Sequence, residues 1–293
     1  MAAFDKDTQP LADDEAINQH IERALRVRPP SGVDLQLAYQ LVKKTLQPEI
    51  TGVENIPHNP CLFVGNHSLF ALDGLVVMPL FLKELRRFPR SMGDRFLFAN
   101  PRVGNFILRN GGVMGHPKVC SALMEDGQDL LVFPGGAYEA VKPLSQLYEL
   151  QWKERHGFVR LAAENGYTIM PFGLVGPDEF YGHLMEGQDI PDSKLGKALT
   201  RVGLLNSETR TDILPPIPIG ALGSVLPKPQ KCFLGFGKPV DLSQHKGKTL
   251  TMNKLRNLRE RVANEIETQI DVLLESQAKS RQHQGLVRRL LTR

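Results

Sequence analysis

A chain of 293 residues with 41% hydrophobic and 23% charged residues has the composition of an ordinary folded protein with a sizeable core. Its formal net charge of +4 is too small to indicate a nucleic-acid-binding protein. The longest apolar run, from Gly74 to Leu82, is about half of the ~18 residues that a membrane-spanning helix needs.

Charge and cysteine usage bear on where the protein works. The start of the chain is acidic. After Glu275 there is no acidic residue, and the charged residues are all basic: Lys279, Arg281, Arg288, Arg289 and Arg293. The three cysteines (Cys61, Cys120 and Cys232) lie far apart without metal-ligand spacing, which fits free thiols in a reducing compartment. Residues 1–19 lack the basic-then-apolar pattern of a signal peptide. We expect a cytoplasmic protein, peripheral at the inner face of a membrane, with no signal peptide and no transmembrane helix.

The first half of the chain predicts two helices and one strand. Residues 1–30 form a polar lead-in that ends in a Pro-Pro-Ser-Gly breaker. Helical spacing of apolar residues follows from 35 to 46, and Pro48 closes that helix. Residues 61–65 predict a buried strand, and residues 73–85 predict a helix that Pro79 makes irregular.

The second half adds three strands and two long helices. Apolar runs predict strands at 129–133, 167–175 and 231–236, and periodic stretches predict helices at 147–164 and from Leu255 to Ile270. Proline and glycine are dense from 177 to 229, which predicts a long surface excursion with one or two short helices.

This order of elements predicts the fold class. Strands separated by helices favour an α/β fold with a mostly parallel central sheet flanked by helices, in a single domain with N-terminal helices and a C-terminal helix. We divide the chain into an N-terminal lead-in and helix (1–47), a core (48–242), and a C-terminal helix with a basic tail (243–293).

The pair His67 and Asp73 is the strongest candidate for chemistry. A carboxylate that orients an imidazole makes a general base able to take a proton from a hydroxyl. Six positions apart, the two cannot share a helix face, so they meet only if His67 lies in the loop after the strand and Asp73 starts the next helix. That layout places both at the carboxyl end of a strand, where open α/β sheets bind ligands. The alternative is a histidine bonded to a backbone carbonyl and an aspartate that caps a helix.

Three further segments carry weaker signals. Arg109 follows an apolar stretch, where it either clamps a phosphate or carboxylate or lies in a surface ion pair. The strand that runs into Phe133-Pro134-Gly135-Gly136 either leaves room for a substrate, with free N–H groups facing an oxyanion, or ends in an ordinary turn. Pro171 lies inside an apolar strand, a position that proline tolerates mainly at edges or irregularities.

In this order the four segments resemble the motif blocks of the PlsC-like glycerolipid acyltransferase superfamily over roughly residues 48–242. That pattern is a His with a nearby Asp, a Gly-x-x-Phe-Ile-x-Arg block, a Phe-Pro-x-Gly block and an apolar strand with Pro. Five residues rather than the usual four separate His67 from Asp73, and Gly135 and Tyr138 stand where the third block has Glu and Arg. The Phe-Pro-Gly-Gly form with Glu139 looks like the branch of diacylglycerol acyltransferase-like proteins and phytyl ester synthases, whose acceptors are neutral.

The resemblance implies acyl transfer from an acyl thioester, either acyl-CoA or acyl-carrier protein, to a hydroxyl of a lipid acceptor. It implies His67 as the general base and Asp73 as its partner, with no metal and no cofactor besides the co-substrate. The substrate contacts it implies come from Asn66, Arg109, Phe133, Pro134, Gly135, Gly136 and Glu139.

The expected partners are the lipid acceptor, the acyl donor and a membrane surface, and not nucleic acid. The basic stretch from Lys83 to Arg109 suits a phosphate-bearing donor, or is a solvated face. Near the end of the chain, an apolar helical stripe lies beside basic residues and suits an anionic membrane surface, or is a frayed basic tail. The stripe consists of Leu286, Val287, Leu290 and Leu291, and the basic residues are Arg288, Arg289 and Arg293.

Other functions fit parts of the sequence. Gly65-Asn66-His67 resembles a metallophosphoesterase block, but that chemistry needs two metals, and the Asp and His blocks that should precede this point are missing. A serine hydrolase would need a Gly-x-Ser-x-Gly elbow, which does not occur. A non-catalytic relative of the same fold that binds lipid or acyl-CoA stays an alternative because the third block is altered.

Overall fold

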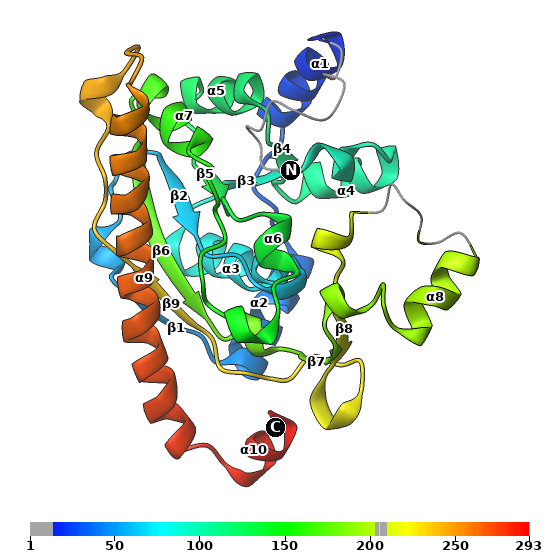
Figure 1. Cartoon of the computed structure of the whole chain (residues 1–293). Helices are drawn as coiled ribbons and strands as arrows, with labels where there is room; N and C mark the ends of the chain where they lie inside the picture. The colour runs from blue at the N-terminus through cyan, green and yellow to red at the C-terminus, as the bar shows by residue number, and fades with distance from the viewer. Residues whose placement is uncertain (1–13, 203–204, 206–209, 293) are drawn as a thin grey trace.

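A computed structural model describes residues 14–202, 205 and 210–292, which form an α/β fold (Figure 1). Within these residues, seven strands make one sheet in the order β1-β9-β6-β2-β5-β3-β4, and neighbouring strands are parallel except for β6 and β9. The strands of this sheet are β1 (Glu49–Thr51), β2 (Cys61–Gly65), β3 (Arg90–Gly93), β4 (Val113–Met114), β5 (Leu130–Val132), β6 (Thr168–Val175) and β9 (Phe233–Phe236). The prediction of a mostly parallel sheet is confirmed.

Helices cover both faces of the sheet (Figure 1). The helices are α1 (Asp14–Leu25), α2 (Val33–Leu46), α3 (Asp73–Leu80), α4 (Pro101–Arg109), α5 (Pro117–Glu125), α6 (Ala137–Ala140), α7 (Gly157–Asn165), α8 (Lys194–Arg201), α9 (Met252–Gln282) and α10 (Leu286–Leu291). A π-helical turn over Phe81–Leu85 follows α3 directly, so the irregularity predicted around Pro79 takes that form.

Strand β2 lies in the middle of the sheet and every one of its residues is buried. Leu62 and Val64 pack in the cluster that includes residues of α5, α7 and α9, whereas Cys61 and Phe63 pack on the other face with residues of α3. The continuous apolar run is therefore a strand covered on both faces, as parallel strands are.

The long helix α9 lies close against β6 and β9, which Figure 1 shows running alongside it. A side chain at Gly173 would press on Gln269 and Ile270 of α9 at 3.0 Å, and one at Gly235 would also meet the Gln269 side chain. The missing side chains at these two positions therefore let the helix approach the strands and cover this part of the sheet.

The polar lead-in expected at the N-terminus is wrong for residues 14–25, which form α1 with Ile17, His20 and Ala24 buried. The fully buried Arg90 of β3 donates to the carbonyls of Ala24 (2.8 Å) and Gly111 (3.0 Å) and so attaches α1 to the sheet. Burial lowers the pKa of Arg90 to about 10. Besides these three residues, only Ile21 packs on the core among the described residues of α1, so the helical period is hidden among polar residues. The lead-in residues 1–13 lie outside the described residues.

The helix expected over 147–164 is wrong in its first half, because only Gly157–Asn165 is helical. Backbone N–H groups of the preceding segment bond to buried carboxylates, Tyr148 to Asp178 (3.0 Å) and Gln151 to Glu139 (2.8 Å). A segment whose N–H groups are held by side chains cannot use them within a helix.

Pro171 lies in β6, between β9 and β2, and not in an edge strand. Ile169 faces Val240 and Phe172 faces Phe236, so the facing chain carries one extra residue beside the proline. The irregularity that the sequence led us to expect is therefore present next to Pro171.

The excursion at 177–229 contains α8, as predicted, and also an unpredicted two-stranded antiparallel sheet of β7 (Gly182–Met185) and β8 (Ile217–Ile219). Strands β1, β3 and β4 and helices α4 and α5 were not predicted either. The three strands have two to four residues each, too few to show a period. Across the described ranges, no helix is both long and apolar enough to cross a bilayer.

Candidate active site

The carboxyl ends of three adjacent parallel strands, β6, β2 and β5, meet at one edge of the sheet. The chain leaving β2 carries His67, the chain leaving β5 carries Phe133 and then α6, and the chain leaving β6 carries Asp178. Open α/β sheets bind ligands at such an edge.

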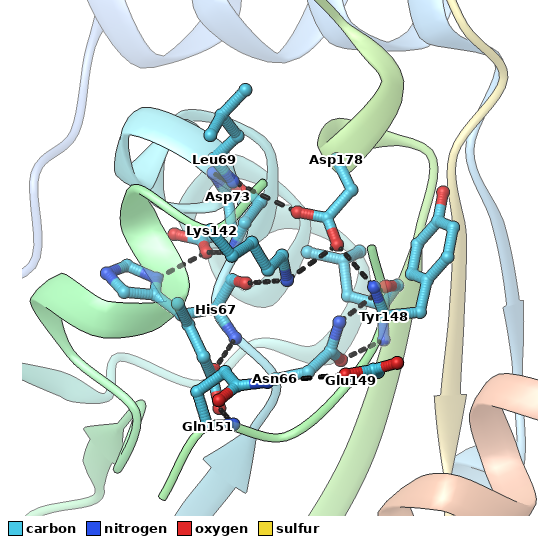
Figure 2. A network of polar contacts seen from close by, with 12 residues as sticks. Asn66, His67, Leu69, Asp73, Lys142, Tyr148, Glu149, Gln151 and Asp178 are labelled. Carbon is cyan, nitrogen blue, oxygen red and sulfur yellow. Dashed lines mark hydrogen bonds and ion pairs between the residues drawn. The ribbon is translucent and has the colours of Figure 1, made fainter. Parts of the chain in front are cut away.

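His67 and Asp73 are in direct contact there, with His67 Nδ1 2.5 Å from Asp73 Oδ2 (Figure 2). Asp73 is the first residue of α3, and its side chain is 1% exposed against 14% for that of His67. Ser68 completes the arrangement, since its N–H donates to Asp73 Oδ2 (2.6 Å) and its hydroxyl accepts from the Asp73 N–H (2.9 Å). The loop-and-helix layout that the spacing required is the one observed.

The proton positions follow from these contacts. An ionised Asp73 can only accept, so Nδ1 of His67 donates to it and Nε2 keeps its lone pair. Burial lowers the pKa of His67, but the Asp73 carboxylate, its hydrogen bond and the charge of Glu139 outweigh burial, so the pKa is raised above its usual 6.5. Asp73 Oδ1 is buried and has no hydrogen-bond partner among the described residues.

Phe133 and Glu139 hold His67 from the β5 side. The rings of His67 and Phe133 stack with centroids 4.6 Å apart and 7° between their planes. Glu139 is fully buried; its Oε2 accepts the N–H of His67 (2.6 Å) and its Oε1 the N–H of Gln151 (2.8 Å). Burial raises the pKa of Glu139. Through its bond to the His67 N–H, the Glu139 carboxylate holds the backbone that carries the imidazole.

The loop Pro134–Gly136 has less free backbone than the sequence suggested. The N–H of Gly136 donates to the Phe133 carbonyl (3.0 Å), so it does not face an oxyanion. Arg155 Nη1 donates to the carbonyls of Pro134 (2.8 Å) and Gly135 (2.6 Å). A Cβ on Gly135 would fall on the carboxyl group of Glu139, so any other residue here would displace that side chain.

The side chains of Asn66 and Arg109, two of the predicted substrate contacts, have no hydrogen bond to the side chains of His67 and Asp73 among the described residues. The buried amide of Asn66 donates to the Leu174 carbonyl (2.9 Å) and accepts from the Leu174 N–H (2.8 Å), which ties β2 to β6. Arg109 is exposed as the last residue of α4. Contacts of either residue with a substrate stay predictions.

Lys142 and Asp178, which were not predicted from the sequence, form a buried ion pair that contacts the loop after His67 (Figure 2). The residues come from different strand ends and share no motif. The available signal was a lysine soon after the glycine-rich turn and an aspartate soon after a strand, which is too common to single them out.

Two cavities of the described residues bear on the site and the end of the chain, and the dyad lines neither. One of about 300 Å³ is lined by Lys142 and Gln151, each of which neighbours the dyad in the hydrogen-bond network, and by polar residues of α6 and the excursion. The other, of about 510 Å³, lies beneath α10.

Metal and thiol chemistry find little support in the described residues. Those residues contain no group of three or more His, Cys, Asp and Glu side chains arranged to hold a metal, which the metallophosphoesterase alternative requires. The three cysteines are free and buried, and burial raises their pKa, that of Cys120 to about 12. A buried thiol with a raised pKa is a poor nucleophile.

Comparison with known families now adds to this geometry. Residues 47–175 match the model of the protein family described as Acyltransferase. The match covers somewhat less than half of the chain and includes the first six strands of the sheet. It contains His67, Asp73, Glu139 and Lys142 and ends three residues before Asp178.

Curated proteins similar to this chain have names that refer to ester and storage-lipid synthesis. The chain is 28% identical over 206 residues to phytyl ester synthase 1, chloroplastic, of Arabidopsis thaliana, covering 66% of this chain and 29% of that protein. It is 32% identical over 123 residues to the DGAT1/2-independent enzyme synthesizing storage lipids of Gallus gallus, covering 42% and 37%. The chain thus spans about a third of the length of these curated relatives.

A solved structure, the 1-acyl-sn-glycerophosphate (LPA) acyltransferase PlsC from Thermotoga maritima, is also similar. It overlaps 87% of this chain and 88% of that chain with 16% identity and a TM-score of 0.44. A score this low carries no conclusion about the site.

Proposed function

We propose that this protein is an O-acyltransferase that moves a fatty acyl group from an acyl thioester to a hydroxyl of a lipid acceptor. The observation that carries the proposal is the contact of His67 with Asp73, 2.5 Å, at the carboxyl edge of the sheet and within the segment that matches the Acyltransferase family model. A buried carboxylate that fixes an imidazole is what activation of a hydroxyl requires.

The proposed step uses one base for both proton transfers. Nε2 of His67 takes the proton of the acceptor hydroxyl as its oxygen attacks the thioester carbonyl, and Asp73 stabilises the imidazolium that forms. The C–S bond then breaks and the thiolate leaves with the proton from His67. General-base help of this kind contributes ~10²–10⁴ in rate, or ~3–5 kcal/mol of barrier.

A neutral acceptor is the better match for the third motif block. Tyr138 stands where the resemblance expects Arg, and its hydroxyl already bonds Asp212 (3.0 Å) and Arg210 (2.8 Å). Arg210 pairs with Asp212, and Arg155 is held by loop carbonyls. We therefore propose an acceptor without phosphate, such as a long-chain alcohol or diacylglycerol.

The donor is proposed to be acyl-CoA or acyl-carrier protein, and the basic stretch from Lys83 to Arg109 contributes less to its binding than the sequence suggested. Arg87 pairs with Asp129 (2.5 Å) and Arg90 is fully buried, so both are committed to the fold. The exposed basic residues of the stretch are Lys83, Arg86, Arg102 and Arg109.

The proposal is tested by incubating the purified protein with labelled acyl-CoA, or acyl-carrier protein, and a panel of hydroxyl acceptors. Ester formation with at least one acceptor is expected, and the panel identifies which. The alternative, a lipid-binding relative without activity, predicts retention of the labelled donor and no ester with any acceptor.

The pH dependence follows from the raised pKa of His67. The imidazole accepts a proton only when neutral, so activity should fall as pH drops through the His67 pKa. Because that pKa is raised above 6.5, the acid limb of kcat/KM should have its midpoint above 6.5. A midpoint near 4, in the range of a carboxyl group, would contradict His67 as the base.

Membrane contact through the end of the chain is also part of the proposal. Leu286 and Val287 of α10 are 82% and 73% exposed, whereas Arg288 donates to the carbonyl of Thr45 (2.6 Å) at the end of α2. The helix is therefore attached to the body with apolar side chains outward, an arrangement that suits an anionic bilayer surface. Arg293 lies outside the described residues.

Replacing Leu286 and Val287 by aspartate should lower co-sedimentation with anionic liposomes several-fold, because it removes apolar area and adds repulsive charge. The control is Val272→Asp, which likewise replaces an exposed apolar side chain by an acidic one, at a 52% exposed position of α9. Truncation at Glu275 is less suitable, since Gln277 and Arg281 of α9 both bind Glu179. Unchanged sedimentation of the double variant would exclude the tail as the membrane contact.

A further inference from the structure

Lys142 and Asp178 form an ion pair inside the protein, next to the dyad (Figure 2). Lys142 Nζ lies 2.7 Å from Asp178 Oδ2, and the two side chains are 0% and 1% exposed. Burial of two charges costs solvation that their attraction repays only with good geometry and further hydrogen bonds. A buried pair is therefore weak evidence of stabilisation, and its remaining contacts indicate what else it does.

Those contacts flank a single residue, Ser68. On one side, Lys142 Nζ donates to the carbonyl of His67 (2.9 Å), and on the other, Asp178 Oδ1 accepts the N–H of Leu69 (3.0 Å). Ser68 itself bonds Asp73 through both its N–H and its hydroxyl. The ion pair thus holds the backbone on either side of the residue that joins the two members of the dyad.

The loop between His67 and Asp73 needs such support because its backbone is strained. Phe70 and Ala71 both adopt left-handed conformations, with φ of 57° and 58°. Residues with a Cβ avoid this region, and two in succession persist only where surrounding contacts determine the conformation. The loop between His67 and Asp73 has five residues, and the left-handed conformations of Phe70 and Ala71 turn the chain back to Asp73.

The pair also connects the other strand ends. Asp178 Oδ2 accepts the N–H of Tyr148 (3.0 Å), and the same segment continues to Gln151, whose N–H binds Glu139. Electrostatically, the charge of Lys142 lowers the pKa of His67 and so opposes the effects of Asp73 and Glu139.

We propose that Lys142 and Asp178 are a positioning pair, which fixes the loop between His67 and Asp73 so that the imidazole stays against its carboxylate. This inference rests on the proposed function, since the imidazole it positions is the proposed base. Neither Lys142 nor Asp178 touches the reacting atoms; both act through the backbone of the loop.

The test compares a single and a double variant. Lys142→Met leaves a buried, unpaired carboxylate and should lower both thermal stability and kcat. Adding Asp178→Asn removes the uncompensated charge at nearly constant side-chain size, and the amide oxygen can still accept one of the two backbone N–H groups, so part of the stability should return. The donor to the His67 carbonyl is still missing, so kcat should stay at least tenfold low while KM changes less than twofold.

Two readouts separate positioning from simple stabilisation. In the Lys142→Met single variant, where the Lys142 charge is gone and the Asp178 carboxylate remains, the acid limb of kcat/KM should move to higher pH. The far-downfield proton resonance of His67 Nδ1–H bound to Asp73, assigned by its loss in His67→Ala, should be shifted or broadened. This resonance needs no substrate, so it tests the positioning pair even if no acceptor is ever acylated.

A matched control exists at the other end of the same strand. Arg87 and Asp129 form an ion pair with 17% and 10% exposed side chains, and Asp129 binds the N–H of Cys61 at the start of β2. Arg87→Met with Asp129→Asn should leave the resonance and the acid limb unchanged. The proposal is overturned if kcat recovers together with stability in the Lys142→Met/Asp178→Asn variant, or if KM rises while kcat is unchanged, which would make Lys142 a substrate contact.

Discussion

His67→Ala should lower the rate of acyl transfer by ~10²–10⁴, the range that general-base catalysis contributes. The fold should survive, because the structural hydrogen bonds of His67 to Glu139 and Lys142 use its backbone N–H and carbonyl, which alanine keeps. The substitution removes a side chain that is only 14% exposed and that stacks on Phe133, so a modest fall in thermal stability is expected.

The measurement is kcat with the best acceptor from the panel, alongside circular dichroism and thermal unfolding. His58→Ala is the matched control, because His58 is exposed and lies before β2. Wild-type turnover in a folded His67→Ala protein would remove the dyad from the mechanism and leave the fold without an assigned base.

Gly135→Ala should be the second most damaging change, although it adds a single methyl group. Its Cβ would coincide with the carboxyl group of Glu139, so that side chain must leave its place. Glu139 then no longer accepts the N–H groups of His67 and Gln151. We expect a loss of ~1–3 kcal/mol in the free energy of unfolding, typical of overpacking, and at least a tenfold fall in kcat.

Gly74→Ala is the control for this change. Gly74 follows Asp73 in α3, and a Cβ there meets nothing within 4 Å, so stability and kcat should be unchanged or slightly raised. Combining Gly135→Ala with Glu139→Ala should recover part of the lost stability, since the clash is gone, but not the activity. An active Gly135→Ala protein with unchanged stability would show that Glu139 does not hold the His67 backbone.

The dyad could be predicted because its two members are close in sequence and because a local rule connects them. A buried strand at 61–65 ends just before His67, and Asp73 begins a helix, so the two side chains could meet only across the loop between these elements. The strands and helices of the core were also predictable where their apolar runs are long and periodic, whereas short ones such as β1, β3 and β4 were not.

The supporting roles of Glu139, Lys142 and Asp178 could not be predicted, because they depend on tertiary contacts; of the three, only Glu139 was named from the sequence, as a substrate contact. Glu139, Lys142 and Asp178 reach His67 or its loop across 72, 75 and 109 positions of sequence, and no periodic pattern encodes such pairs. The same contacts explain the wrong helix at 147–164, whose early N–H groups serve two of these carboxylates. Asn66, next to the dyad, was predicted to contact substrate, yet its amide joins two strands.

The position of Asp178 limits how this protein can be dissected for expression. A fragment cut where the family match ends, at residue 175, would retain Lys142 and lose its counterion, and it would also lack β9 and α9, which cover β6. Such a fragment should collapse or aggregate and would wrongly suggest an inactive enzyme. Any minimal version of the protein therefore has to extend through the end of α9, about a hundred residues past the recognisable motifs.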